Sequence, residues 1–159
     1  CRFDSYIGRL DEFARYTNEH IELMREGIRQ GFVLPSVVLE GYQETITTHI
    51  YEDATKSPFF TPFTKFPKHI TDSDRKRLSQ EGLDKIAKIV IPSYQRFLDF
   101  MNAEYLPGTR SSLGASALPN GREFYRHRVR KFTTLEVSPE EVHTLGLSEV
   151  KRIRSTYCK

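Results

Sequence analysis

The chain has 159 residues, of which 38% are hydrophobic, 12% aromatic and 28% charged. Apolar runs such as Ile89-Val90-Ile91 are far shorter than the roughly 18 residues that a membrane-spanning helix needs, so the sequence predicts a soluble chain without a membrane span. The net charge of +3 is small, which argues against nucleic-acid binding. The aromatic content and the periodic apolar residues indicate a folded domain rather than a disordered one.

The first half of the chain contains two segments with helical patterning. Apolar residues three and four positions apart predict an amphipathic helix over residues 3–28, with Gly31 as its C-terminal signal. A second helical segment is expected over residues 35–51, because Pro35 suits a first helical turn. Gly41 lies inside this segment, and we expect it to allow the close approach of a neighbouring helix.

Residues 53–70 are predicted to form a loop, because prolines at three positions disfavour both helices and sheet ladders. The loop also carries four phenylalanines, which need cover from water. Either they pack on the helices or on another domain, or they form an exposed patch that binds a partner. The candidate partner-binding residues are Phe59, Phe60, Phe63 and Phe66.

A long third helix is predicted to begin at Thr71 or Asp72 and to run to about Tyr105. Pro92 lies inside it and should kink it, because proline has no N–H for the helical hydrogen bond. A second loop, rich in Gly, Ser and Pro, follows over residues 106–121.

The C-terminal part begins with the densest basic stretch, residues 122–131. It is either an anion or phosphate site or a solvated helix face. Residues 131–137 have a pattern that is compatible with an extended segment. Ser138, followed by proline and two glutamates, predicts the start of a last helix that runs to about Tyr157, with a local break at Gly146.

Together these segments predict an all-α fold class, a bundle of four to five helices with two long ordered loops. We expect one helical region over residues 1–159. A long coiled coil is the alternative architecture, but heptads are not sustained along the chain.

Histidines and carboxylates in the sequence do not form a complete metal-binding motif. His-Glu-x-x-His is absent, so a zincin site is not encoded. Glu123 and His127 are four residues apart and would share a helix face, but two ligands do not make a site. Glu140 and His143 form one Glu-x-x-His, whereas di-metal bundles use two. We therefore expect no catalytic residue, no metal and no cofactor within this chain.

Two cysteines, Cys1 and Cys158, lie at opposite ends of the sequence and do not form a Cys-x-x-Cys pair. Whether they form a disulfide depends on geometry that the sequence does not give. The chain starts at Cys rather than Met and directly enters a helical pattern, so it is expected to be processed or truncated, with no targeting segment and an undefined compartment.

Two stretches near the C-terminus, residues 118–134 and 138–154, resemble the bacterial domain-of-unknown-function family 885 in sequence. Four earlier stretches are similar to the same family: Gly31-Phe-Val-Leu-Pro, Ser57-Pro-Phe-Phe, Ile91-Pro-Ser-Tyr and Glu104-Tyr-Leu-Pro. The resemblance extends from about residue 5 to residue 155.

The resemblance implies a larger, mostly helical protein of the gluzincin-like metallopeptidase clan. The zinc motif of that clan, a His-Glu helix with further ligands, would lie beyond the matched region. The chain is then expected to be an internal fragment that lacks the zinc motif, is non-catalytic on its own and shapes a cleft. Zinc, a peptide substrate and the remainder of the protein would belong to the parent.

Three residues of the basic stretch are candidates for groups that face such a cleft, namely Arg122, Tyr125 and His127. Arginine and tyrosine can orient a peptide carbonyl or carboxylate. A packed tyrosine and solvated cations are the other interpretation of these residues. The alternative function is a non-catalytic helical binding or scaffold module that recognises a protein partner.

Overall fold

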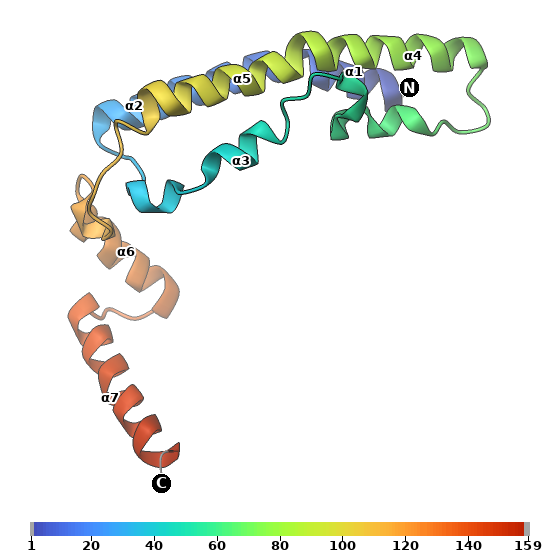
Figure 1. Cartoon of the computed structure of the whole chain (residues 1–159). Helices are drawn as coiled ribbons and strands as arrows, with labels where there is room; N and C mark the ends of the chain where they lie inside the picture. The colour runs from blue at the N-terminus through green and yellow to red at the C-terminus, as the bar shows by residue number, and fades with distance from the viewer. Residues whose placement is uncertain (1, 158–159) are drawn as a thin grey trace. The chain divides into compact units, whose positions relative to one another are not determined.

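The structure is a computed structural model that describes residues 2–157, which form seven α-helices and no strand (Figure 1). The predicted all-α bundle is confirmed. The chain divides into two compact units, the first ending at Ser111 and the second beginning at Ser112. The single region expected over residues 1–159 stays a prediction. Cys1 and Cys158 lie outside the described residues, and with them the question of their pairing.

The N-terminal pattern folds as two helices, α1 (Arg2–Asp11) and α2 (Phe13–Gln30), rather than as the one helix expected. Glu12 separates them, but its N–H still donates to the carbonyl of Gly8 at 3.2 Å, so helical hydrogen bonding crosses the break. Gly31 ends α2 in the left-handed conformation with φ 76°, as the C-terminal signal predicted.

The second segment is shorter and less regular than expected. It consists of a 3₁₀ helix (Ser36–Leu39) and the helix α3 (Tyr42–Thr47). Gly41 lies between them with φ 79°, and a Cβ built there would have no atom within 4 Å. The expectation that Gly41 allows close helix approach is therefore wrong. Its glycine is needed for the left-handed backbone that joins the two elements.

One long helical rod forms the centre of the first unit, as predicted for residues 72–105. It consists of α4 (Asp72–Lys85), a π-helical turn (Ile86–Val90), α5 (Ile91–Phe100) and a second π-helical turn (Met101–Tyr105) (Figure 1). The hydroxyl of Thr71 caps the start of the rod, where it accepts a hydrogen bond from the N–H of Asp74.

Pro92 follows directly after the first π-helical turn. Proline cannot donate a helical hydrogen bond, and the wider turn accommodates this, because the N–H of Ile91 donates to the carbonyl of Ile86. Ser93 has a relative exposure of 0%, and its hydroxyl donates to the carbonyl of Ile89 at 2.6 Å. The disturbance predicted at Pro92 thus takes the form of a π-helical turn within a continuous rod.

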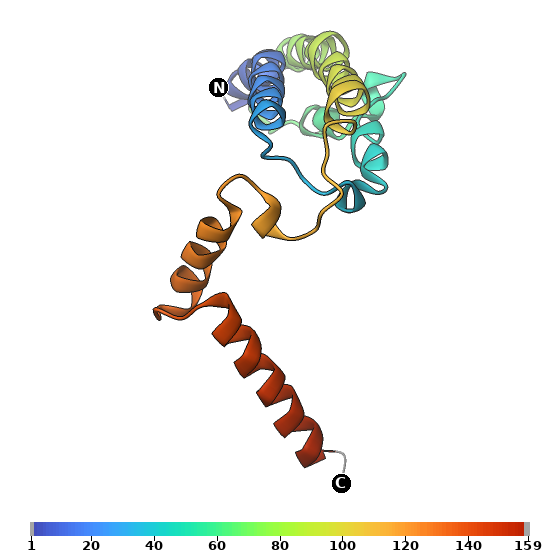
Figure 2. The same ribbon diagram turned by 90° about the vertical axis from the view of Figure 1, so that its left-hand side faces the viewer.

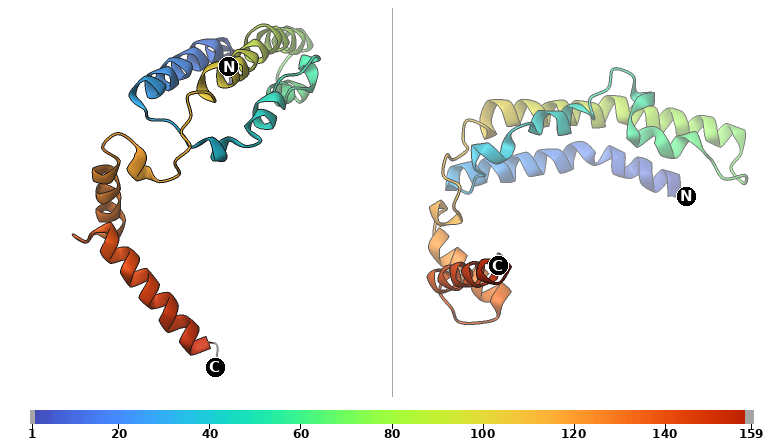
Figure 3. Two further views of the ribbon diagram at one scale, coloured as in Figure 1. Left: turned by 60° about the vertical axis from the view of Figure 1, so that its left-hand side comes forward. Right: turned by 60° about the horizontal axis from the view of Figure 1, so that its bottom comes forward.

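Helices α1 and α2 run along this rod, and α3 lies on another side of it (Figures 2 and 3). Helix α1 contacts α4, whereas α2 and α3 both contact α5. Two apolar clusters fill the space between them. The first centres on Leu78, Ile86 and Val90 with Ile7 and Leu10. The second centres on Ile21, Val33, Leu39, Ile46, Phe100, Met101 and Tyr105.

The phenylalanine-rich segment is more ordered than the predicted loop, with two 3₁₀ helices (Ala54–Lys56 and Pro58–Thr64). Phe63 is buried, and its ring lies so close to Gly82 of α4 that a Cβ added to Gly82 would be 2.4 Å away. The other three phenylalanines are half-buried against the first cluster. Of the two readings, packing on helices of the same unit is the one that the contacts show.

The second unit contains a 3₁₀ turn (Ala115–Ala117), α6 (Gly121–Thr133) and α7 (Pro139–Tyr157). Helix α6 ends at Thr134, which has φ 60°, so residues 131–137 do not form the extended segment considered above. Helix α7 continues through Gly146, and the break expected there is wrong. Glycine lowers helix propensity by only about 1 kcal/mol, which a 19-residue helix tolerates.

Candidate functional site

A hollow of about 460 Å³ lies between α6 and the start of α7, within the second unit. It is lined by Glu123, Arg126, His127, Arg130, Glu136, Val137, Ser138 and Glu141. Among the three predicted cleft-facing residues, His127 is the one that reaches this hollow. Arg122 and Tyr125 do not line it.

Helix geometry explains why the three candidates do not converge. The four α6 residues that line the hollow follow a spacing of three and four, which places them on one helix face. At about 100° per residue, Tyr125 points roughly 160° and Arg122 roughly 140° away from His127. Spacing along the basic stretch could have indicated this division, because residues two and five apart do not share a face.

Ion pairs occupy the arginines at the rim of the hollow. Arg126 contacts Glu123 at 3.0 Å, and Arg130 contacts Glu136 at 2.7 Å. These four side chains are between 63% and 74% exposed, so each pair contributes little to stability. The pairing favours the reading of the basic stretch as a solvated helix face rather than as an anion site.

Ser138 and Glu141 form the capping box that the sequence predicted at the start of α7. The carboxylate of Glu141 accepts hydrogen bonds from the backbone N–H of Ser138 at 2.7 Å and from its hydroxyl at 2.8 Å. In return, the hydroxyl oxygen of Ser138 accepts from the N–H of Glu141 at 3.1 Å. The bond from the backbone N–H, followed by that from the hydroxyl, lowers the pKa of Glu141.

The chemistry that this hollow can support is limited by those contacts. Glu123 is paired with Arg126 and Glu141 is bonded to Ser138, which leaves the imidazole of His127 without a carboxylate committed to it. Within residues 2–157, no group of three His, Cys, Asp or Glu side chains is placed to hold a metal ion. The hollow can therefore present a polar surface, with His127 as its titratable imidazole.

An uncovered apolar stripe runs along α7. Its members are Val142, Gly146, Val150, Ile153 and Tyr157, and their spacing of four, four, three and four places them on one helix face. Exposure ranges from 39% for Val142 to 82% for Tyr157, and no described residue of α7 is buried. An amphipathic helix in this state presents a surface suited to protein contact.

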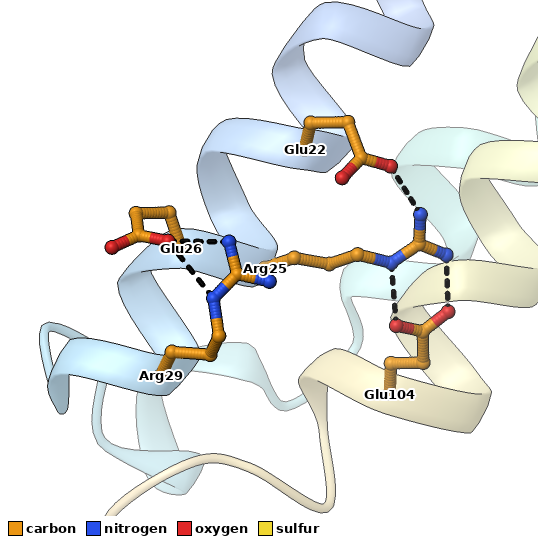
Figure 4. A network of polar contacts seen from close by, with 5 residues as sticks. All are labelled: Glu22, Arg25, Glu26, Arg29 and Glu104. Atoms are coloured by element: carbon orange, nitrogen blue, oxygen red, sulfur yellow. Dashed lines mark hydrogen bonds and ion pairs between the residues drawn. The ribbon is translucent and has the colours of Figure 1, made fainter.

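A polar network fastens α2 to the second π-helical turn of the rod (Figure 4). The guanidinium of Arg25 binds both carboxylate oxygens of Glu104, at 2.7 Å from Nε and 2.5 Å from Nη2. The same group also donates to Glu22 at 2.5 Å, while Arg29 pairs with Glu26 one turn further along α2 (Figure 4).

The electrostatic consequence of the network is a matched shift of two groups. Hydrogen bonding to Arg25 lowers the pKa of Glu104, and the bonds to Glu104 and then Glu22 raise the pKa of Arg25. Arg25 also lies over the ring of Phe100, 5.4 Å from its centroid. Arg25 and Glu104 are 79 residues apart in sequence, and no local motif links them, so sequence reasoning did not find this contact.

The fold and the site define a class: an all-helical chain whose second unit presents uncovered surface and carries no metal cluster within residues 2–157. The chain belongs to the family described as "Bacterial protein of unknown function (DUF885)", which matches residues 1–158. No curated protein matches the sequence. None of the helices within residues 2–157 is long and apolar enough to cross a bilayer.

One solved structure is similar to the whole of this fold. It is the crystal structure of "the putative lipoprotein from Colwellia psychrerythraea", with a TM-score of 0.82 and 25% sequence identity. The match covers 97% of this chain and 27% of that chain. This chain thus spans about a quarter of the length of that protein.

Proposed function

We propose that this chain is a helical part of a larger metallopeptidase-like hydrolase, in which it is non-catalytic and shapes the wall of a cleft. The hydrolase assignment rests on the sequence resemblance described above. The observation that carries the structural part is the apolar stripe of α7, because a face of that composition needs a protein surface to cover it. The match to 27% of the Colwellia protein supports a longer parent chain.

Within this proposal, His127 is the side chain that faces the cleft. It lies in the hollow between α6 and α7, whereas Tyr125 and Arg122 project from other faces of α6. Zinc and the catalytic groups would be supplied by other parts of the parent, and a peptide is the substrate class that the resemblance implies.

The test compares this chain with the longer parent protein. Zinc content and peptide hydrolysis are measured on both, and we expect both only in the parent. Amide hydrogen exchange then follows α7, whose amides should exchange more slowly in the parent because its stripe is covered there. Helix α4 serves as the internal control, since its core contacts lie within the first unit.

The two halves of the proposal fail separately. A parent without zinc and without hydrolysis would contradict the hydrolase assignment alone. Equal exchange of α7 in the two proteins would contradict its burial by the parent.

A binding or scaffold module that recognises a protein partner is the second candidate, because the same stripe would suit a separate protein. Replacing Val150 and Ile153 with Glu should abolish partner recovery in a pulldown if the stripe is the contact. Phe60→Ser and Phe66→Ser test the phenylalanines originally considered, whose partner-binding role stays a prediction. Phe63→Ser is unsuitable because Phe63 is buried in the core.

A further inference from the structure

We propose that the first unit binds a neutral aromatic group with one hydrogen-bond donor, a phenol or an indole, in a cavity between α2 and α5. The cavity has a volume of about 250 Å³. This inference does not depend on the proposed hydrolase function, because all the residues that carry it belong to α2 and α5 of the first unit.

The walls of the cavity are aromatic. Phe13, Tyr16 and His20 project from α2, and Tyr94 and Phe97 project from α5. Phe13 lies 5.4 Å from Tyr94, and Tyr16 lies 4.1 Å from His20, measured between ring centroids. Rings at these separations leave faces and edges that favour a further aromatic group in offset or edge-to-face geometry.

The polar side chains in the walls are turned away from the cavity. The hydroxyl of Thr17 donates to the carbonyl of Phe13 at 2.9 Å, and the hydroxyl of Ser93 donates to that of Ile89 at 2.6 Å. Both groups therefore satisfy their hydrogen bonds within their own helices. The cavity loses little by excluding water, because an apolar cavity offers water too few partners.

His20 supplies the one polar contact at the rim. Its Nδ1 lies 2.8 Å from the carbonyl oxygen of Tyr16 and must carry the proton there, because a carbonyl only accepts. In the neutral imidazole Nε2 is then an acceptor. A phenol O–H or an indole N–H can donate to it while the ring enters the aromatic walls.

Size and charge narrow the ligand class further. An apolar cavity of about 150 Å³ is large enough for benzene, so about 250 Å³ accommodates a substituted ring. None of the described residues that line the cavity is Asp, Glu, Lys or Arg. A cationic ligand such as a quaternary ammonium could contact the rings but would find no opposite charge. A neutral group fits better.

The aromatic group could come from a free small molecule or from a side chain of a peptide, and the test distinguishes these sources. The chain contains no tryptophan, so indole fluorescence reports on the ligand without interference. The complete chain is titrated into indole, and separately into a short peptide with one central Trp. We expect a saturable shift in emission. Tighter binding of the peptide would identify the peptide source, and equal or weaker binding would identify the free molecule.

Three variants locate the binding. Thr17→Met places a longer apolar side chain in the cavity and should abolish saturable binding, because it fills the space. Tyr16→Ala removes one exposed wall and should weaken binding about fivefold. Leu23→Ala is the matched control on the same helix, since Leu23 is 67% exposed and does not line the cavity. It should bind as the wild type does.

Thermal unfolding of each variant confirms that it is folded. The absence of a saturable shift with the wild-type chain, or unchanged binding by a folded Thr17→Met, would overturn the proposal. So would displacement of indole by tetramethylammonium at lower concentrations than by phenol, because the site would then select a cation.

Discussion

Gly82 in α4 faces the ring of Phe63, and its lack of a side chain allows the phenylalanine segment to lie against the rod. A Cβ at this position would be 2.4 Å from the ring. Phe63 is 4% exposed and cannot swing into solvent, so the added methyl must be accommodated inside the core.

Gly82→Ala should therefore lower the free energy of unfolding by about 1–3 kcal/mol, the usual cost of overpacking. Gly8→Ala is the matched control, because Gly8 is also helical but has nothing within 4 Å of its added Cβ. It should raise stability by about 0.5–1 kcal/mol. Urea unfolding curves measure both, and equal effects of the two substitutions would contradict the close contact.

The pair of Arg25 and Glu104 should make stability depend on pH. The pKa of Glu104 is lower in the folded chain than its ordinary value of 4.5. Its contribution to stability is therefore fully present above about pH 4.5 and is lost as the pH falls through the lower pKa of the folded state.

Glu104→Gln should destabilise the chain at neutral pH, and its difference from the wild type should disappear in acid, where Glu104 is protonated and also uncharged. Denaturant unfolding at a series of pH values measures this. Glu19→Gln is the control, since Glu19 pairs only with Arg15 within α2 and joins no two elements. A difference for Glu104→Gln that is constant across pH would show that its charge is not the source.

At the scale of elements, the sequence predicted what local rules determine. The stripes of α1, α2 and the long rod follow apolar spacing, and Thr71 and Ser138 have the side chains that cap helices. Gly41 was misread because spacing alone does not show a backbone angle. The pairing of Arg25 with Glu104 and the cavity between α2 and α5 depend on which helices become neighbours, and a single sequence does not contain that information directly.

Helix α7 depends on its cap more than a buried helix does, because no described residue of α7 is buried. Ser138→Ala should destabilise the helix by about 1 kcal/mol. Amide hydrogen exchange should become faster in the first turns of α7. Ser155→Ala, near the other end of the helix, should leave those turns unchanged. Equal exchange in Ser138→Ala and the wild type would show that the capping box is not what stabilises this end.

At the scale of the whole molecule, the two units differ in how much they bury. Both apolar clusters lie in the first unit, whereas Gly121 is the one buried residue of the second unit among those described. Folding of a separate unit requires a core that offsets the loss of conformational entropy.

Residues 1–111 expressed alone should therefore retain a cooperative thermal transition close to that of the whole chain. Residues 112–159 alone should show low helicity and no cooperative transition. Circular dichroism on the two separate pieces measures both. A cooperative transition of the second piece would mean that its helices need no covering surface, which would also weaken the role proposed for the stripe of α7.

The π-helical turns of the rod have a consequence for how this family can vary. Each turn, Ile86–Val90 and Met101–Tyr105, holds one more residue than the α-helical path would need. Removing one residue from the first turn would restore regular winding and rotate everything after it by about 100°. Glu104 would then turn away from Arg25, and Tyr94 from the aromatic cavity. Family members with a one-residue deletion there should lack both features together, whereas insertions in the surface loops should leave both in place.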